Sequence, residues 1–139
     1  MTATADELVA RARRRISRVK PADLEALATA GGLIVDIRPV AQRAEEGELP
    51  GAVVIERNVL EWRLDPTGEH RISEVTGYDQ PVVVVCSEGY ASSLAADTVR
   101  ALGYRNAADL IGGYRAWLAW RDTAERASGG DPGVTSPAS

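Results

Sequence analysis

The segment PVVVVCSEGYASS, residues 81–93, predicts the architecture of this chain. Four consecutive valines, Val82–Val85, stand between a proline and a polar loop that carries a glycine, which is typical of a strand buried on both faces of a parallel sheet. After the loop, apolar residues recur at helical spacing over residues 94–102, and Gly103 marks a helix end. The segment therefore predicts a strand, a loop and a helix, with Cys86 at the carboxyl end of the strand, where open parallel sheets bind ligands.

Short apolar strands alternate with helical segments along the rest of the chain. The other expected strands are residues 16–19, 33–35, 53–55 and 106–110. Helical patterns cover residues 1–16, 21–30, 40–46 and 57–64, and a last helix follows Gly112 and Gly113. This alternation predicts an α/β fold with a mostly parallel central sheet and helices on both faces. The aromatic residues of the last helix, Tyr114, Trp117 and Trp120, are expected to pack in the core.

The length of 139 residues is enough for one ordinary domain. Residues 1–15 are expected to form an N-terminal helical extension whose arginine-rich end is solvated. Residues 16–126 form the predicted domain. Residues 127–139 are rich in glycine, serine and proline and are expected to be a disordered tail.

Composition excludes several classes of function. With 16 Lys and Arg against 20 Asp and Glu, a general nucleic-acid surface is not expected. No apolar run approaches the roughly 20 residues that cross a bilayer, so no membrane partner is expected. A single cysteine excludes an internal disulfide and indicates a reducing compartment, by default the cytoplasm. Cys86 and His70 cannot by themselves form a structural zinc site, so neither a metal nor a cofactor is expected, and His70 is interpreted as a solvated surface residue.

Two interpretations apply to Cys86. A lone cysteine at the end of a valine-rich strand is often an inert, buried small hydrophobe. Here, however, the polar loop and the following helix would surround the thiol with backbone N–H groups and the positive end of a helix dipole, which favour a thiolate. Asp36 and Arg38, which follow the strand at residues 33–35, form either a structural ion pair or part of the same pocket.

Four blocks of sequence carry a resemblance to a known family. They are LIVDIRP at residues 33–39, GELPGAVVI at 47–55, VVVVCSEGYASS at 82–93 and LIGGYRAW at 110–117. In this order they resemble the motifs of the rhodanese-like, single-domain sulfurtransferases, over about residues 16–122. The resemblance implies a rhodanese-like fold.

The resemblance also implies a chemistry. Cys86 would attack the outer sulfur of a donor such as thiosulfate, form a persulfide and pass the sulfur to cyanide or a thiol, including a thiol on a protein acceptor. The residues expected to surround the sulfur with N–H groups are Ser87, Glu88, Gly89, Tyr90, Ala91 and Ser92. Gly89 suits such a loop because glycine readily adopts positive φ.

Two loop positions depart from the family pattern. Ala91 stands where many members have an arginine that holds an anionic donor, and Glu88 adds a negative charge that should disfavour the thiolate and repel thiosulfate. Arg38, Arg57 or Arg63 would restore positive potential if it faced the pocket. Asp36 would orient loop or arginine groups, or simply pair with Arg38.

Two other functions remain open on the sequence. A rhodanese-like binding or regulatory module without turnover is favoured by Glu88 and Ala91 and opposed by the presence of Cys86. A phosphatase or arsenate reductase would also use a cysteine loop on an α/β scaffold. Such sites need a loop arginine that clamps an oxyanion, and neither Ala91 nor Ser92 can do this.

Overall fold

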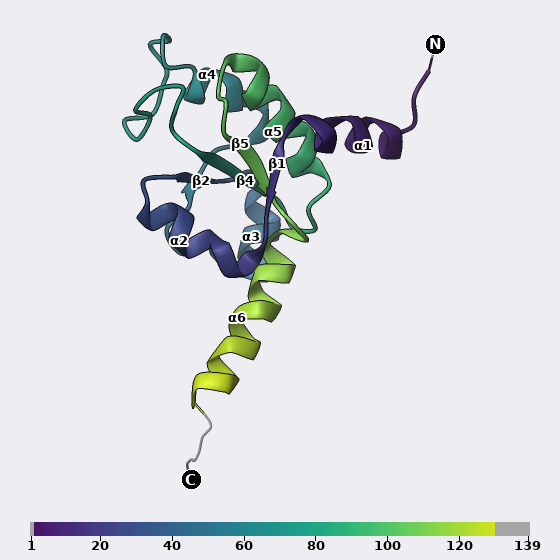
Figure 1. The fold of residues 1–139 in the computed structure, drawn as a ribbon, viewed down its shortest axis with the longest axis vertical. Coiled ribbons are helices and arrows are strands. Elements are labelled where there is room, and N and C mark those ends of the chain that lie inside the picture. The colour runs from purple at the N-terminus through teal and green to yellow at the C-terminus, as the bar shows by residue number, and fades with distance from the viewer. Residues whose placement is uncertain (1, 130–139) are drawn as a thin grey trace.

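All five strands of the central sheet run parallel, in the order β1-β5-β4-β2-β3 (Figure 1). The computed structural model describes residues 2–129. The strands are β1 (Ser17–Val19), β2 (Leu33–Asp36), β3 (Val53–Val54), β4 (Val82–Val85) and β5 (Ala107–Leu110). The predicted α/β fold with a parallel sheet is confirmed, and β4, the strand of the opening segment, lies at the centre of the sheet.

Within the described residues, six α-helices connect or flank these strands. They are α1 (Ala5–Arg15), α2 (Leu24–Thr29), α3 (Val40–Glu46), α4 (Leu60–Leu64), α5 (Ala91–Leu102) and α6 (Gly113–Gly129). Short 3-10 turns, Pro21–Asp23 and Arg57–Val59, precede α2 and α4. No helix within the described range 2–129 has both the length and the apolar character needed to cross a membrane.

The alternating side chains of β4 divide the core into two halves. Val82 and Val84 pack with residues of α4 and α5, whereas Val83 and Val85 pack with residues of α2 and α6. All four valines have no exposed surface, as expected for a strand covered on both faces. Cys86 continues the alternation and belongs to the half that packs with α5.

The N-terminal helix α1 packs on α5 (Figure 1). It begins with a capping box, in which Thr4 and Glu7 exchange hydrogen bonds, and it buries Val9 and Ala12. Its basic end is not simply solvated as predicted. Arg13 is half-buried and hydrogen-bonds to residues of the loop after β4 and the first turn of α5, because the packing of α1 on α5 brings it there.

The last helix, α6, begins against the sheet and then extends away from the body of the molecule (Figure 1). Tyr114 is buried in the core as predicted, but Trp120 is 36% exposed and does not belong to it. The helix continues to Gly129, so residues 127–129 are helical rather than part of a tail. The rest of the predicted tail, residues 130–139, lies outside the described residues.

Candidate active site

The thiol of Cys86 lies inside the curl of the loop that joins β4 to α5. Its Sγ atom accepts hydrogen bonds from the backbone N–H of Gly89 at 3.1 Å and of Ser92 at 3.3 Å. Ser92 is the second residue of α5, so the sulfur faces the positive end of a helix of 12 residues. Backbone donors and a helix N-terminus both stabilise negative charge on sulfur. The loop therefore presents two backbone N–H donors and a helix N-terminus to the sulfur.

Glycine is required at the turn of this loop. Gly89 has φ of +89°, and a Cβ atom there would lie 2.8 Å from the backbone nitrogen of Gly112. On the other side, Gly113 has φ of +69°, and its Cβ would lie 2.5 Å from the carbonyl oxygen of Cys86. The missing side chains let the start of α6 press against the loop.

The first turn of α6 fixes the backbone on either side of the sulfur. The N–H of Tyr114 donates to the carbonyl of Cys86 at 2.8 Å, and the N–H of Arg115 donates to the carbonyl of Ser87 at 3.1 Å. The first N–H groups of a helix have no partners within the helix. Here they bind the loop. These hydrogen bonds bring the start of α6 close to the loop backbone, and this explains why two glycines follow the last strand.

A cavity of about 220 Å³ opens beside the thiol and is lined by Gln42, Cys86, Ser87, Glu88, Tyr90 and Ala91. Cys86 as a whole is almost covered, with only 9% of the residue exposed. All six loop residues named from the sequence are thus brought around the sulfur. Four line the cavity, and the other two, Gly89 and Ser92, donate N–H groups to Sγ.

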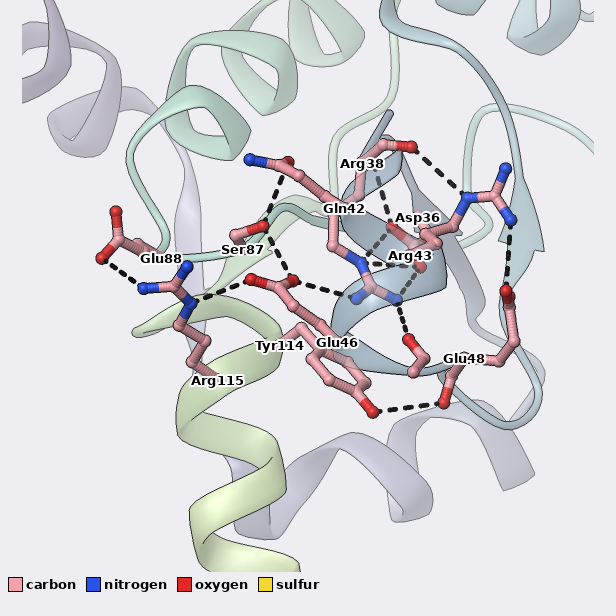
Figure 2. A network of polar contacts seen from close by, with 11 residues as sticks. Asp36, Arg38, Gln42, Arg43, Glu46, Glu48, Ser87, Glu88, Tyr114 and Arg115 are labelled. Atoms are coloured by element: carbon pink, nitrogen blue, oxygen red, sulfur yellow. Dashed lines mark hydrogen bonds and ion pairs between the residues drawn. The ribbon is translucent and has the colours of Figure 1, made fainter. Parts of the chain in front are cut away.

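A polar network centred on Glu46 borders the cavity (Figure 2). One Glu46 oxygen accepts from the Ser87 hydroxyl at 3.0 Å, and the other accepts from Nε of Arg115 at 2.9 Å. Arg115 also reaches Oε2 of Glu88 at 3.2 Å. Burial alone would raise the pKa of Glu46, but hydrogen bonds from Arg115, Ser87 and Arg38 outweigh burial and lower it. Glu46 is thus an anion that orients Ser87, and Glu88 is partly neutralised by Arg115.

Asp36 and Arg38 form a closed ion pair (Figure 2), and neither residue lines the cavity. Nη2 of Arg38 lies 2.7 Å from Oδ2 of Asp36, and the two side chains are 0% and 1% exposed. The Arg38 guanidinium also donates to the carbonyl of Gly47 at 2.9 Å and lies over the ring of Tyr114. Burial would lower the pKa of Arg38, but its hydrogen bonds and ion pairs with Asp36 and Glu46 raise it. Of the two alternatives for Asp36 and Arg38, the structure shows the ion pair; neither residue, although both were candidates for substrate binding, lines the cavity beside Cys86.

The other two candidate arginines are engaged elsewhere. Arg57 pairs with Glu61 at 3.1 Å, one turn along the same helical segment. Arg63 donates to the carbonyl of His70 at 2.7 Å. Neither belongs to the lining of the cavity beside Cys86. His70 is exposed, as the sequence predicted.

Sequence reasoning missed the buried carboxylate of Asp109, which lies on β5 and has no exposed surface. It accepts hydrogen bonds from the hydroxyls of Ser92 at 2.9 Å and Ser93 at 2.8 Å, and it pairs with Arg18 at 2.9 Å. Asp109 thereby ties the first turn of α5 to β5 and β1. The signal was present in the sequence, since a charged residue inside a buried strand requires a partner.

Comparisons with known proteins agree with this geometry. Residues 20–119 match the rhodanese-like domain family. Thiosulfate sulfurtransferase GlpE of Pseudomonas savastanoi is 28% identical over 105 residues, which cover 73% of this chain and 87% of that protein. A human single-domain sulfurtransferase structure is 28% identical with a TM-score of 0.62, covering 73% of this chain and 95% of that one.

A third relative has a different description. A protein of unknown function from Rhodopseudomonas palustris, described as a possible tyrosine phosphatase, is 29% identical with a TM-score of 0.75. The match covers 89% of this chain and 93% of that chain. The family match spans most of the described residues and includes the sheet centre, the Cys86 loop and the start of α6. The chain therefore belongs to the rhodanese-like domain family.

Proposed function

We propose that this protein is a sulfurtransferase that carries sulfane sulfur as a persulfide on Cys86. The observation that supports this most directly is the pair of backbone N–H groups, from Gly89 and Ser92, that both reach Sγ. A persulfide anion needs such donors around it, as does the thiolate that forms it. The sulfurtransferase relatives of similar size support the same class of reaction.

The reaction takes place in two transfers. In the first, the Cys86 thiolate attacks the outer sulfur of thiosulfate, an S–S bond forms on Cys86, and the S–S bond of thiosulfate breaks as sulfite leaves with the electron pair. In the second, cyanide or a thiolate attacks the outer sulfur of the persulfide and the Cys86 thiolate leaves. The products are thiocyanate or a new persulfide, and no external oxidant is needed. An acceptor thiol on a protein is included in this proposal, and a free thiolate carrier suits the reducing cytoplasm.

The charges at the cavity are compatible with an anionic donor. Glu88 lines the cavity, but its carboxylate is paired with Arg115, so its repulsion of the donor is weaker than the sequence suggests. Burial of Arg38 removes it from direct contact with a donor. Thiosulfate would therefore be held mainly by backbone N–H groups at the loop.

The loop supports phosphate chemistry less well, despite the relative described as a possible tyrosine phosphatase. Tetrahedral oxyanions are commonly clamped by an arginine with two parallel hydrogen bonds. Residues 87–92 include no arginine. The guanidinium of Arg13, which does approach the loop, is bonded to the carbonyl of Gly89. We therefore favour sulfur transfer over phosphate hydrolysis.

Mass spectrometry of the intact protein tests the proposal. Incubation with thiosulfate, or with glutathione persulfide as a second donor, is expected to add one sulfur atom, which cyanide then removes as thiocyanate. A parallel incubation with p-nitrophenyl phosphate is expected to release no nitrophenol. If neither donor adds sulfur, the protein is instead a rhodanese-like binding module without turnover.

Replacing Glu88 with glutamine is expected to raise kcat/KM for thiosulfate about two- to threefold, because a partly paired surface charge beside an anionic donor is removed. The gain is expected to shrink at high ionic strength, which steady-state kinetics at low and high salt will show. Glu69→Gln is the control. Glu69 is exposed in the connection before β4, and its replacement by glutamine makes the same change in net charge. An equal gain in both variants would show that Glu88 has no local effect on the donor.

A further inference from the structure

The carbonyl group of Gly89 is held by side chains from outside the loop. It accepts from Nη2 of Arg13 at 2.8 Å and from Nη2 of Arg18 at 3.4 Å. Nε of Arg13 also donates to the hydroxyl of Ser93 at 3.0 Å. The guanidinium of Arg13 therefore binds the turn of the loop and the first turn of α5 at the same time.

Holding this carbonyl fixes the direction of an N–H group at the cavity. The peptide bond between Gly89 and Tyr90 is trans, because the described residues include no cis peptide, so its C=O and N–H point in opposite directions. With the carbonyl bound to Arg13, the N–H of Tyr90 points away from α1. Tyr90 itself lines the cavity, and its ring lies over the Arg13 guanidinium, 5.5 Å from the ring centroid.

The second arginine is held in place by the buried carboxylate on β5. Arg18 contacts both oxygens of Asp109, with Nε at 2.9 Å and Nη2 at 3.3 Å. Asp109 also accepts from Ser92, whose N–H binds the Cys86 sulfur. Arg18 is partly exposed and Asp109 is fully buried, and their charges compensate each other.

We propose that Arg13 and Arg18 are positioning residues for the persulfide loop, and that α1 is part of the active site. They hold the peptide between Gly89 and Tyr90 so that its N–H faces the outer sulfur when Cys86 carries a persulfide. Both arginines precede residue 20, where the family match begins, so this support comes from the part of the chain outside the match. The proposal rests on the sulfurtransferase function proposed above.

Steady-state kinetics of Arg13→Ala with thiosulfate and cyanide test the role of α1. Because the N–H of Tyr90 would meet the outer sulfur once that sulfur is bonded to Cys86, and not while it is still part of the bound donor, kcat is expected to fall on the order of tenfold while KM for thiosulfate changes less than about twofold. Arg14→Ala and Arg15→Ala are the controls. Arg14 is exposed on the same helix, and Arg15 pairs with Asp97 on α5 without touching the loop. Both are expected to keep the kcat of the unchanged protein, and an equal kcat in all three variants would overturn the proposal.

Arg13→Lys separates geometry from charge and from folding. Lysine keeps the positive charge on α1 but cannot bind Gly89 and Ser93 through two fixed N–H groups, so kcat is expected to stay at least about threefold below that of the unchanged protein. A full recovery of kcat in Arg13→Lys would show that only charge matters and would overturn the positioning role. If Arg13→Ala lowers Tm, the kcat of Arg13→Lys tests the positioning role in its place.

Alkylation of Cys86 by iodoacetamide distinguishes failure of this proposal from failure of the proposed function. The reaction needs the loop around the sulfur but no sulfur donor. If the unchanged protein forms no persulfide, a severalfold change in the alkylation rate of Arg13→Ala, absent in Arg14→Ala, would still support positioning by α1. Equal alkylation rates in the two variants would then overturn it.

Discussion

Replacing Cys86 with serine is expected to reduce sulfur transfer at least about a thousandfold, because a serine hydroxyl cannot become a persulfide. Serine is nearly isosteric with cysteine and can accept the same N–H groups from Gly89 and Ser92. The free energy of unfolding is therefore expected to stay within about 1.5 kcal/mol of that of the unchanged protein.

The chain offers a clean background for this experiment. Cys86 is its only cysteine, so the variant has no thiol and any sulfur that adds to the protein must be on another group. Thiocyanate formation and the mass of the intact protein are measured together, with urea unfolding as the check on folding. Substantial transfer by a folded Cys86→Ser protein would rule out the persulfide mechanism.

Replacing Arg38 with methionine is expected to lower the free energy of unfolding by about 3–5 kcal/mol. The change leaves the buried Asp36 carboxylate without its partner and removes the cation from the face of the Tyr114 ring. It also removes the hydrogen bond to the carbonyl of Gly47. Urea unfolding followed by circular dichroism measures the loss.

A double variant and an exposed arginine complete this test. Replacing both charges, in Asp36→Asn with Arg38→Met, leaves no uncompensated buried charge and is expected to be more stable than Arg38→Met alone. Arg57→Met is the control, because its pair with Glu61 is exposed and worth only about 0.5 kcal/mol. If Arg38→Met costs no more than Arg57→Met, the closed pair behind the loop is not a major source of stability.

Much of the fold follows from local patterns in the sequence. The valine run predicts a central strand because β-branched residues buried on both faces suit a parallel sheet, and β4 occupies that position. The change from strand spacing to helical spacing after residue 93 predicts α5, and Gly103 ends it as expected. The same patterns place Cys86 at the carboxyl end of β4. These features depend on a few consecutive residues, so the sequence is sufficient to find them.

Boundaries that depend on packing were less predictable. The composition of residues 127–139 indicates a tail, yet α6 continues to Gly129. Helical spacing on α6 predicts which side of the helix is apolar, but not where the body of the protein stops covering it. Trp120 is therefore partly exposed although Tyr114, on the same helix, is buried.

By itself, the sequence determined the parallel sheet, the loop after β4 and the position of Cys86 at the start of that loop. Only the tertiary structure decided which arginine meets which acceptor. The sequence left Arg38 open between the pocket and a pair with Asp36, and it is buried against Asp36, whereas Arg13 looked solvated but binds Gly89, 76 positions away. The physical reason is that arginines have the same charge and the same long, flexible side chain wherever they occur. Which partner each arginine contacts depends on how the helices and strands pack, and that packing cannot be inferred from residue type and spacing.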